Sequence, residues 1–104
     1  MTETTQLDGV LNNEAENRFE VRAGNDIAWI DYDRSGNQIT FTHTEVPEAF
    51  EGKGMGKGLV TAALDFARGE DLEVIPRCRF IASYIQRNPE YLELVPESNR
   101  SLVS

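Results

Sequence analysis

A glycine-dense stretch separates two halves of the chain in which apolar residues repeat with different periods. It consists of Glu51, Gly52, Lys53, Gly54, Met55, Gly56, Lys57 and Gly58, and it contains four of the eight glycines and both lysines. Glycine allows the backbone to approach a ligand closely, and a following helix presents unpaired N–H groups and the positive end of its dipole. Two interpretations are open, an anion-binding loop or a turn followed by an ordinary helix start.

The half before this stretch has the period-two alternation of β-strands. Residues 18–23 predict a first strand, residues 27–34 a second and residues 38–46 a third, with turns at 24–26 and 35–37. The second strand carries apolar residues on both faces, which predicts a central strand covered on two sides. The two sets are Ala28, Ile30 and Tyr32, and Ile27 and Trp29.

The half after the glycine stretch has helical spacing. Leu59 to Gly69 predicts an amphipathic helix, residues 72–75 predict a short strand, and residues 80–85 predict a second helix that ends at Asn88-Pro89. Three antiparallel strands followed by helix, strand and helix predict an α+β, or mixed α/β, fold. The strand–helix–strand unit is expected to be a right-handed crossover, which leaves its two strands parallel.

The length of 104 residues suits one small domain. Residues 1–17 are rich in Thr, Asn and Glu and are expected to form a mobile leader that can contain a short ordered piece. Residues 18–95 are expected to form the single domain, and residues 96–104 a polar tail.

Composition argues against several classes of partner. Eighteen acidic and ten basic residues give a net charge of −8, whereas nucleic acids and anionic membranes are bound by basic surfaces. Cys78 is the only cysteine and His43 the only histidine, so neither a disulfide nor a metal cluster is expected. No apolar run is long enough for a signal peptide or a spanning helix. We therefore expect a cytoplasmic protein without nucleic-acid or membrane partners.

The glycine stretch does not match two common nucleotide-binding motifs. A P-loop requires a hydroxyl residue after its lysine, but Gly58 follows Lys57, and a Rossmann unit requires crossovers where hairpins are predicted here. The chain instead resembles the GNAT superfamily of acetyl-CoA-dependent N-acetyltransferases, specifically its minimal single-domain branch, over residues 18 to 94. The resemblance rests on His43-Thr44-Glu45-Val46-Pro47, on Glu51 to Gly56, on Val74-Ile75-Pro76-Arg77-Cys78, and on Tyr84 with Arg87-Asn88-Pro89-Glu90-Tyr91.

This resemblance implies a GNAT-like fold, truncated relative to full GNAT domains, and acetyl-CoA, or coenzyme A, as the bound cofactor. The superfamily loop Gln/Arg-x-x-Gly-x-Gly/Ala is matched by Gly54 and Gly56, but Glu51 stands where Gln or Arg is usual. The backbone N–H groups of residues 51–58 would then bind the pyrophosphate. The pantetheine arm would pair with the third strand between Thr44 and Val46, as an added strand does.

Two candidate catalytic residues lie on the third strand. Either His43 or Glu45 can accept a proton from an amine, and Glu45, or a bound water, is the first choice for a weak general base. In a regular strand both side chains share a face with Ile39 and Phe41, whereas a bulge breaks this inference. The alternatives are a solvated strand end for Glu45 and a packing role for His43.

Two further candidates belong to the second predicted helix. The resemblance implies that Tyr84 protonates the leaving thiolate, and core packing is the alternative. Cys78 is expected in the first turn, between Arg77 and Arg79, where helix N–H groups and positive charge favour a thiolate. It is then either a reactive thiol, even a transient acyl carrier, or a small buried hydrophobe.

The predicted function is acetyl-CoA-dependent transfer of an acetyl group to an amine on a protein or peptide. The alternative is a CoA-binding module with little turnover that serves as a sensor or a partner-binding subunit. Ordinary GNAT domains carry two helices between their first two strands and a closing pair of strands, whereas here residues 24–26 join those strands and little chain follows Tyr91. The acceptor site is therefore expected to be open and shallow, which favours an exposed lysine or chain terminus, and the negative charge attracts cationic amines.

Overall fold

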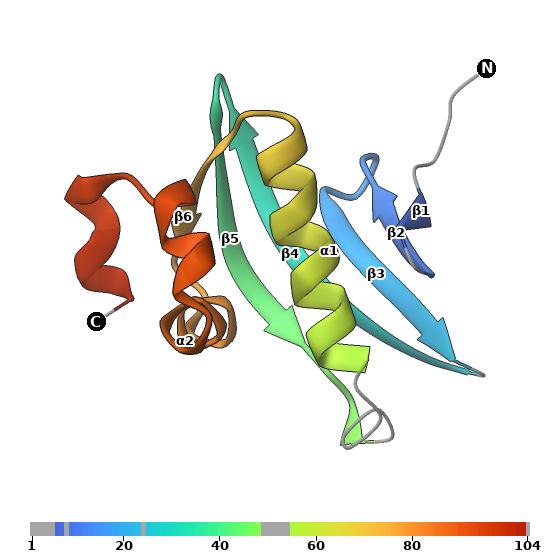
Figure 1. Cartoon of the computed structure of the whole chain (residues 1–104). Helices are drawn as coiled ribbons and strands as arrows, with labels where there is room; N and C mark the ends of the chain where they lie inside the picture. Colours follow the sequence, from blue (N-terminus) through green and yellow to red (C-terminus); the bar gives the residue numbers. More distant parts are fainter. Residues whose placement is uncertain (1–5, 8, 24, 49–54, 104) are drawn as a thin grey trace.

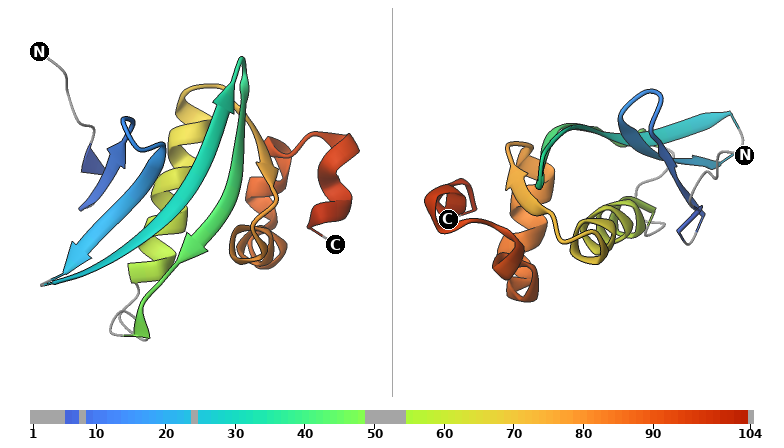
Figure 2. Two further views of the ribbon diagram at one scale, coloured as in Figure 1. Left: turned by 180° about the vertical axis from the view of Figure 1, so that it is seen from behind. Right: turned by 90° about the horizontal axis from the view of Figure 1, so that it is seen from above.

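A single six-stranded sheet carries all the long helices on one face (Figure 1 and Figure 2). The structure is a computed structural model that describes residues 6–7, 9–23, 25–48 and 55–103. The strands lie in chain order and are β1 (Gln6–Leu7), β2 (Val10–Asn13), β3 (Arg18–Ala23), β4 (Asp26–Ser35), β5 (Gln38–Glu45) and β6 (Glu73–Pro76). The helices are α1 (Met55–Gly69), α2 (Arg79–Arg87) and two 3₁₀ helices, η2 (Pro89–Leu94) and η3 (Glu97–Leu102).

The pairing of the strands confirms the mixed α/β fold. Strands β1 to β5 are antiparallel neighbours, and α1 connects β5 to β6, which pairs with β5 in parallel. This is the predicted order of three antiparallel strands followed by helix, strand and helix. The helix packs on the sheet through a core in which Phe19, Ile30, Phe41, Leu59 and Leu64 are fully buried. Burying one such side chain contributes roughly 1.5–3 kcal/mol, so this interface positions α1 firmly.

Three expectations about the ends of the elements are wrong. The sheet begins before residue 18, because β2 pairs with β3 and buries Val10. The segment from residue 96 onward is not only a polar tail, because it forms η3 and buries Val103. Helix α1 begins at Met55 rather than Leu59, so Gly56 and Gly58 lie in its first turns. Glycine is tolerated there because the first N–H groups of a helix have no intrahelical partner in any case.

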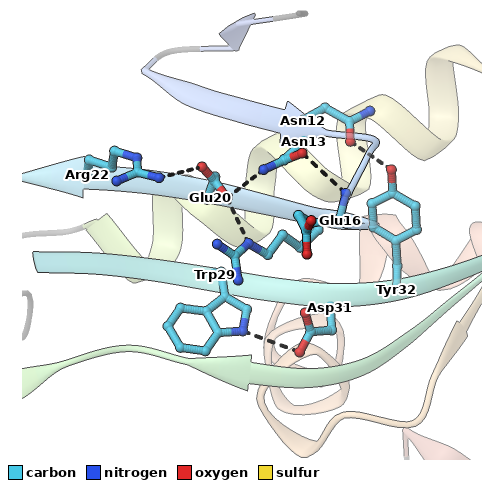
Figure 3. A network of polar contacts seen from close by, with 9 residues as sticks. Asn12, Asn13, Glu16, Glu20, Arg22, Trp29, Asp31 and Tyr32 are labelled. Carbon is cyan, nitrogen blue, oxygen red and sulfur yellow. Dashed lines mark hydrogen bonds and ion pairs between the residues drawn. The ribbon is translucent and has the colours of Figure 1, made fainter.

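The expectation that β4 is covered on both faces is also wrong. Figure 2 shows the helices on one side of the sheet only, and Ile27 and Trp29 on the other face are half-buried. Part of this second face is instead covered by a polar network around Glu20, whose side chain is only 2% exposed (Figure 3). The strands β3 and β4 are joined by a tight turn, so no helix lies between them to cover this open face.

Candidate active site

A β-bulge in β5 decides which side chains face the helices. Asp31 of β4 lies opposite His43, but the next residue, Tyr32, lies opposite Phe41, so Thr42 is an extra residue without a partner across the ladder. One extra residue shifts the alternation of side chains by one position. The expectation that His43 shares a face with Phe41 is therefore wrong.

The shift turns Thr44 and Val46 toward the helices and leaves His43 and Glu45 on the open face. Thr44 is hydrogen-bonded to Cys78 across 2.8 Å between Oγ1 and Sγ, and Val46 packs against the core. His43 and Glu45 both remain more than half exposed, and 2.8 Å separates His43 Nε2 from Glu45 Oε1. The two groups predicted as proton acceptors thus contact each other on the surface of the sheet.

The strands β5 and β6 part where the bulge begins. Their parallel ladder ends at the pair Phe41 and Pro76, while β5 continues to Glu45. Proline has no N–H group to extend the ladder, and the chain then turns away into α2. In the described part of the chain no strand pairs with this edge of β5 at residues 42–45. Figure 1 shows this end of β5 extending beyond β6, between α1 and α2.

Cys78 lies at this opening, although not in the first turn of α2 as expected. It is the N-cap residue, with φ −88° and ψ 125°, and α2 begins at Arg79. Its side chain is 7% exposed and contacts Thr44. Both interpretations of the thiol, reactive or packing, stay open with this geometry.

Tyr84 lies on α2 and reaches across to α1. Its hydroxyl is 3.1 Å from Oγ1 of Thr61, which in turn donates its only hydroxyl hydrogen to the carbonyl of Lys57 at 2.8 Å. The Tyr84 hydroxyl therefore donates to Thr61. The ring also packs against Tyr91, with 5.9 Å between the centroids. Tyr84 has both a packing role and a hydroxyl held in place by a second residue.

A cationic pocket of about 380 Å³ lies between the start of α1 and α2. It is lined by Lys57, Phe80, Tyr84, Arg87 and Asn88. Lys57 and Arg87 have no carboxylate within ion-pair distance among the described residues, and α1 has no acidic residue in its first turn. Unpaired cations beside a helix N-terminus favour an anionic ligand.

Gly56 of α1 lies beside Phe80, one of the residues that line this pocket. A Cβ atom added to Gly56 would lie 3.3 Å from the ring of Phe80 and 3.9 Å from Val46, so any side chain would narrow the space between α1 and α2. Gly58 has open space around it, so it is not required for the same reason.

The predicted site residues therefore divide into three sets. The residues on the helix side of the sheet are Thr44, Val46, Gly56, Lys57, Gly58, Cys78 and Tyr84, and His43 and Glu45 lie on the open face. Glu51, Gly52, Lys53 and Gly54 lie outside the described residues, and of Met55 only its place at the start of α1 is described. Arg68 is bound to Glu93 at 2.9 Å and is not part of the pocket.

Sequence reasoning missed the contributions of Thr61, Phe80 and Asn88. A signal for Thr61 was available, because it lies four residues after Lys57, one helical turn further along α1. Phe80 was assigned to the apolar stripe of α2, but it is 42% exposed and lines the pocket. Nothing in the local pattern distinguishes it from a core residue.

Two further searches concern metals and membranes. The described residues contain no group of three or more histidine, cysteine or acidic side chains that could hold a metal ion. None of the helices in the described ranges is long and apolar enough to cross a membrane.

The fold and this site define a small acetyltransferase-type domain, and comparison with known proteins identifies its family. The model of the GCN5-related N-acetyltransferase family matches residues 18–94, so the chain belongs to this family. Acetyl transfer is the general reaction of the family, which generally uses acetyl-CoA.

Individual relatives agree with this assignment. The chain is 42% identical over 81 residues to the protein NATD1 of Homo sapiens, covering 73% of this chain and 72% of the relative. It is 34% identical over 91 residues to NATD1 of Danio rerio, covering 83% of each. The solution structure of a GCN5-like protein from Staphylococcus aureus superposes with a TM-score of 0.65 and 30% identity, covering 78% of this chain and 82% of the other. The predicted resemblance to a minimal GNAT-like protein is confirmed.

Proposed function

We propose that this chain binds acetyl-CoA in the opening between β5 and β6 and transfers the acetyl group to exposed amines of proteins or peptides. Support comes from the end of the β5–β6 ladder at Phe41 and Pro76, which lies between the cationic pocket and the open face of the sheet. Acetyl-CoA supplies an acetyl group as a thioester, which is broken when the carbonyl carbon bonds to the amine nitrogen.

The residues around the opening fit the chemistry of coenzyme A. The unpaired edge of β5 at residues 42–45 can pair with amide groups of the pantetheine arm, as β-strands do with extended peptides. Lys57, Arg87 and the N–H groups at the start of α1 can hold phosphates. The absence of a side chain at Gly56 keeps the approach between α1 and Phe80 open.

The hydroxyl of Tyr84 is our candidate for returning a proton to the departing thiolate. Its oxygen is held in place by the hydrogen bond with Thr61, and it lies within the donor pocket. Thr61 donates its own hydroxyl hydrogen to the Lys57 carbonyl and accepts the one from Tyr84, so Thr61 positions the tyrosine oxygen. For the proton transfer, the single phenolic hydrogen of Tyr84 would turn from Thr61 to the thiolate. Cys78 lies at the opening beside Thr44 and is our candidate for a transient acyl carrier.

His43 and Glu45 are our candidates for accepting the proton that the amine loses. They lie on the opposite side of β5 from the donor pocket, so an amine arriving at the open face would reach the same opening from the other side. Asp31 lies opposite His43 on β4, which adds a second carboxylate to this surface. Its negative charges suit a cationic lysine side chain or chain terminus.

The decisive experiment titrates the purified chain with acetyl-CoA and with free CoA, and follows acetylation of a basic peptide and of Cys78 by mass spectrometry. We expect both nucleotides to bind and the peptide to be acetylated faster than small amines, with a rate that falls as salt is raised. Binding without turnover would instead support the CoA-binding module, and absence of binding would refute both functions.

Two variants separate the chemical roles from binding. Tyr84→Phe and Glu45→Gln are each expected to lower turnover by roughly 10²–10⁴-fold, the usual contribution of a proton-transfer group, while leaving the affinity for CoA within a few-fold. Glu48→Gln changes an exposed carboxylate on the same segment and serves as the matched control. Turnover that is unchanged in both variants would exclude these two residues from the reaction.

A further inference from the structure

Four basic side chains that lack a carboxylate partner among the described residues all line pockets beside α2. They are Lys57, Arg77, Arg79 and Arg87. By contrast, the arginines elsewhere in the described chain are engaged: Arg18 and Arg22 bind Glu20, Arg34 binds Glu70, Arg68 binds Glu93, and Arg100 donates to the Val95 carbonyl. In a chain with 18 acidic residues against 10 basic ones, the basic side chains of the described residues for which neither a carboxylate nor a carbonyl partner is seen are thus gathered around one helix.

Only two of these four cations belong to the proposed donor site. Arg77 and Arg79 line a different pocket of about 370 Å³, together with Ser83 and Gln86 of α2 and Leu102 at the end of η3. Figure 1 shows η3 beside α2, on the side away from α1. The two pockets share no lining residue.

The two pockets lie on different faces of α2 because of helical spacing. Arg79, Ser83 and Gln86 are separated by four and three residues, so they form one stripe along the helix. Phe80, Tyr84 and Arg87 form the neighbouring stripe, which faces α1. A ligand in one pocket is therefore separated from the other pocket by the body of α2.

We propose that the pocket of Arg77, Arg79, Ser83 and Gln86 is a second ligand site, which binds a small organic anion through a carboxylate or phosphate group. Guanidinium groups bind such oxyanions with paired hydrogen bonds, and the Ser83 hydroxyl and Gln86 amide supply further donors. Pro76, Leu102 and Val103 provide an apolar side for the carbon part of the ligand. This combination of a few polar groups with an apolar wall is typical of small-molecule sites.

The placement of the two arginines is unfavourable without an anion. They are two residues apart and repel each other. They also lie at the N-terminal end of α2, where the helix dipole disfavours positive charge. Both side chains are exposed, so neither is needed to fill the core. Their charge is thus not explained by packing or by an ion pair within the described chain.

The test is an NMR titration of the full chain with inorganic phosphate and, separately, with citrate. We expect saturable shifts of the amide signals of Arg77, Ser83 and Gln86. Because the donor pocket can also hold phosphate, signals of Lys57 and Asn88 can shift too, but along a separate binding curve with a different midpoint. Stronger binding of phosphate than of citrate would assign the ligand to phosphate compounds, and the reverse order would assign it to carboxylates. Shifts of Arg77, Ser83 and Gln86 that grow linearly without saturation, or that follow the same binding curve as those in the donor pocket, would overturn the proposal.

Two variants serve as matched controls for each other. R77Q/R79Q is expected to weaken anion binding at least tenfold and to leave CoA affinity unchanged. R87Q is expected to weaken CoA binding and to leave anion binding at the second site unchanged. All three arginines are exposed, so both variants should remain folded, which the thermal midpoint checks. If R77Q/R79Q weakens CoA binding as strongly as R87Q does, the pocket belongs to the donor site and the second site is refuted. Because the anion titration does not use CoA, its outcome is independent of the proposed acetyl transfer.

Discussion

Glu20 offers the sharpest test of how the open face of the sheet is stabilised. Its carboxylate accepts hydrogen bonds from Arg18 Nε at 2.7 Å, from Arg22 Nη2 at 3.2 Å and from Asn13 Nδ2 at 3.2 Å. Figure 3 shows Arg22 and Asn13 on either side of it. Burial by itself raises the pKa of Glu20, but the hydrogen bonds from Arg18, Asn13 and Arg22 outweigh it and hold the pKa below 4.5.

The size of the effect of Glu20→Gln follows from the exposure of the partners. Arg18 is 27% exposed, so its hydrogen bond to the buried carboxylate is expected to contribute roughly 1.5–3 kcal/mol, as hydrogen bonds to charged groups do. Arg22 is 66% exposed, so its bond is closer to the roughly 0.2–1 kcal/mol of a surface ion pair. Because the amide still fits the space and keeps one acceptor, we expect a net loss of about 2 kcal/mol in the free energy of unfolding. For a domain of this length that lowers the melting temperature by roughly 8–16 °C.

The pH dependence of the free energy of unfolding shows whether the charge of Glu20 causes this loss. A carboxylate with a lowered pKa in the folded state stabilises the fold above its unfolded value of 4.5, and this contribution is lost as the pH falls through the lowered value. Urea unfolding of the wild type and of Glu20→Gln should therefore differ by about 2 kcal/mol at neutral pH and converge as the pH falls through the lowered pKa of Glu20. Glu48→Gln, an exposed carboxylate, is the control. A difference that stays constant over this range would refute the role of the charge.

Two further predictions concern other parts of the sheet and α1. Gly56→Asp should reduce CoA affinity at least tenfold, because it adds a side chain whose Cβ lies 3.3 Å from Phe80 and a negative charge beside Lys57. Gly69→Asp, at the far end of the helix, is the control and should leave the affinity unchanged. Unchanged affinity in a folded Gly56→Asp protein would contradict the donor site. Tyr32→Phe should cost about 1–2 kcal/mol, because the Tyr32 hydroxyl donates to Asn12 at 2.8 Å and the Asn12 amide nitrogen already lacks a partner in the structure. Burial raises the pKa of Tyr32 above 10.0, so the stability that the neutral phenol provides is lost as the pH rises through the raised value. The free energy of unfolding should therefore fall less steeply with rising alkaline pH in Tyr32→Phe than in the wild type. An identical pH dependence in the two proteins would show that Tyr32 does not titrate in this range.

The candidate site was only partly predictable from the sequence. The resemblance singled out Tyr84 as a proton donor, but its contact with Thr61 of α1 was found only in the structure. His43 and Glu45 remain candidates, but the prediction placed them on the wrong face of β5. It failed at Thr42, because a bulge depends on how β5 pairs with β4, and an isolated strand carries no sign of it. The residues 51–54, on which the anion-binding prediction depends most, lie outside the described part of the chain.

The sequence by itself determined the strands β3, β4 and β5, the helices α1 and α2 and the mixed α/β fold, because apolar periodicity and helix or strand ends depend on neighbouring residues along the chain. Only the tertiary structure decided which edges and faces meet. The end of the β5–β6 ladder at Pro76, the contact between Thr44 and Cys78, and the hydrogen bond from Asn13 to Glu20 each join residues from separate elements. Side-chain alternation predicts the exposed polar face of a strand, but Glu20 is buried where Asn13 of β2 and the two arginines of its own strand bind its carboxylate. Such burial depends on the distances among side chains after folding, which local sequence patterns do not contain.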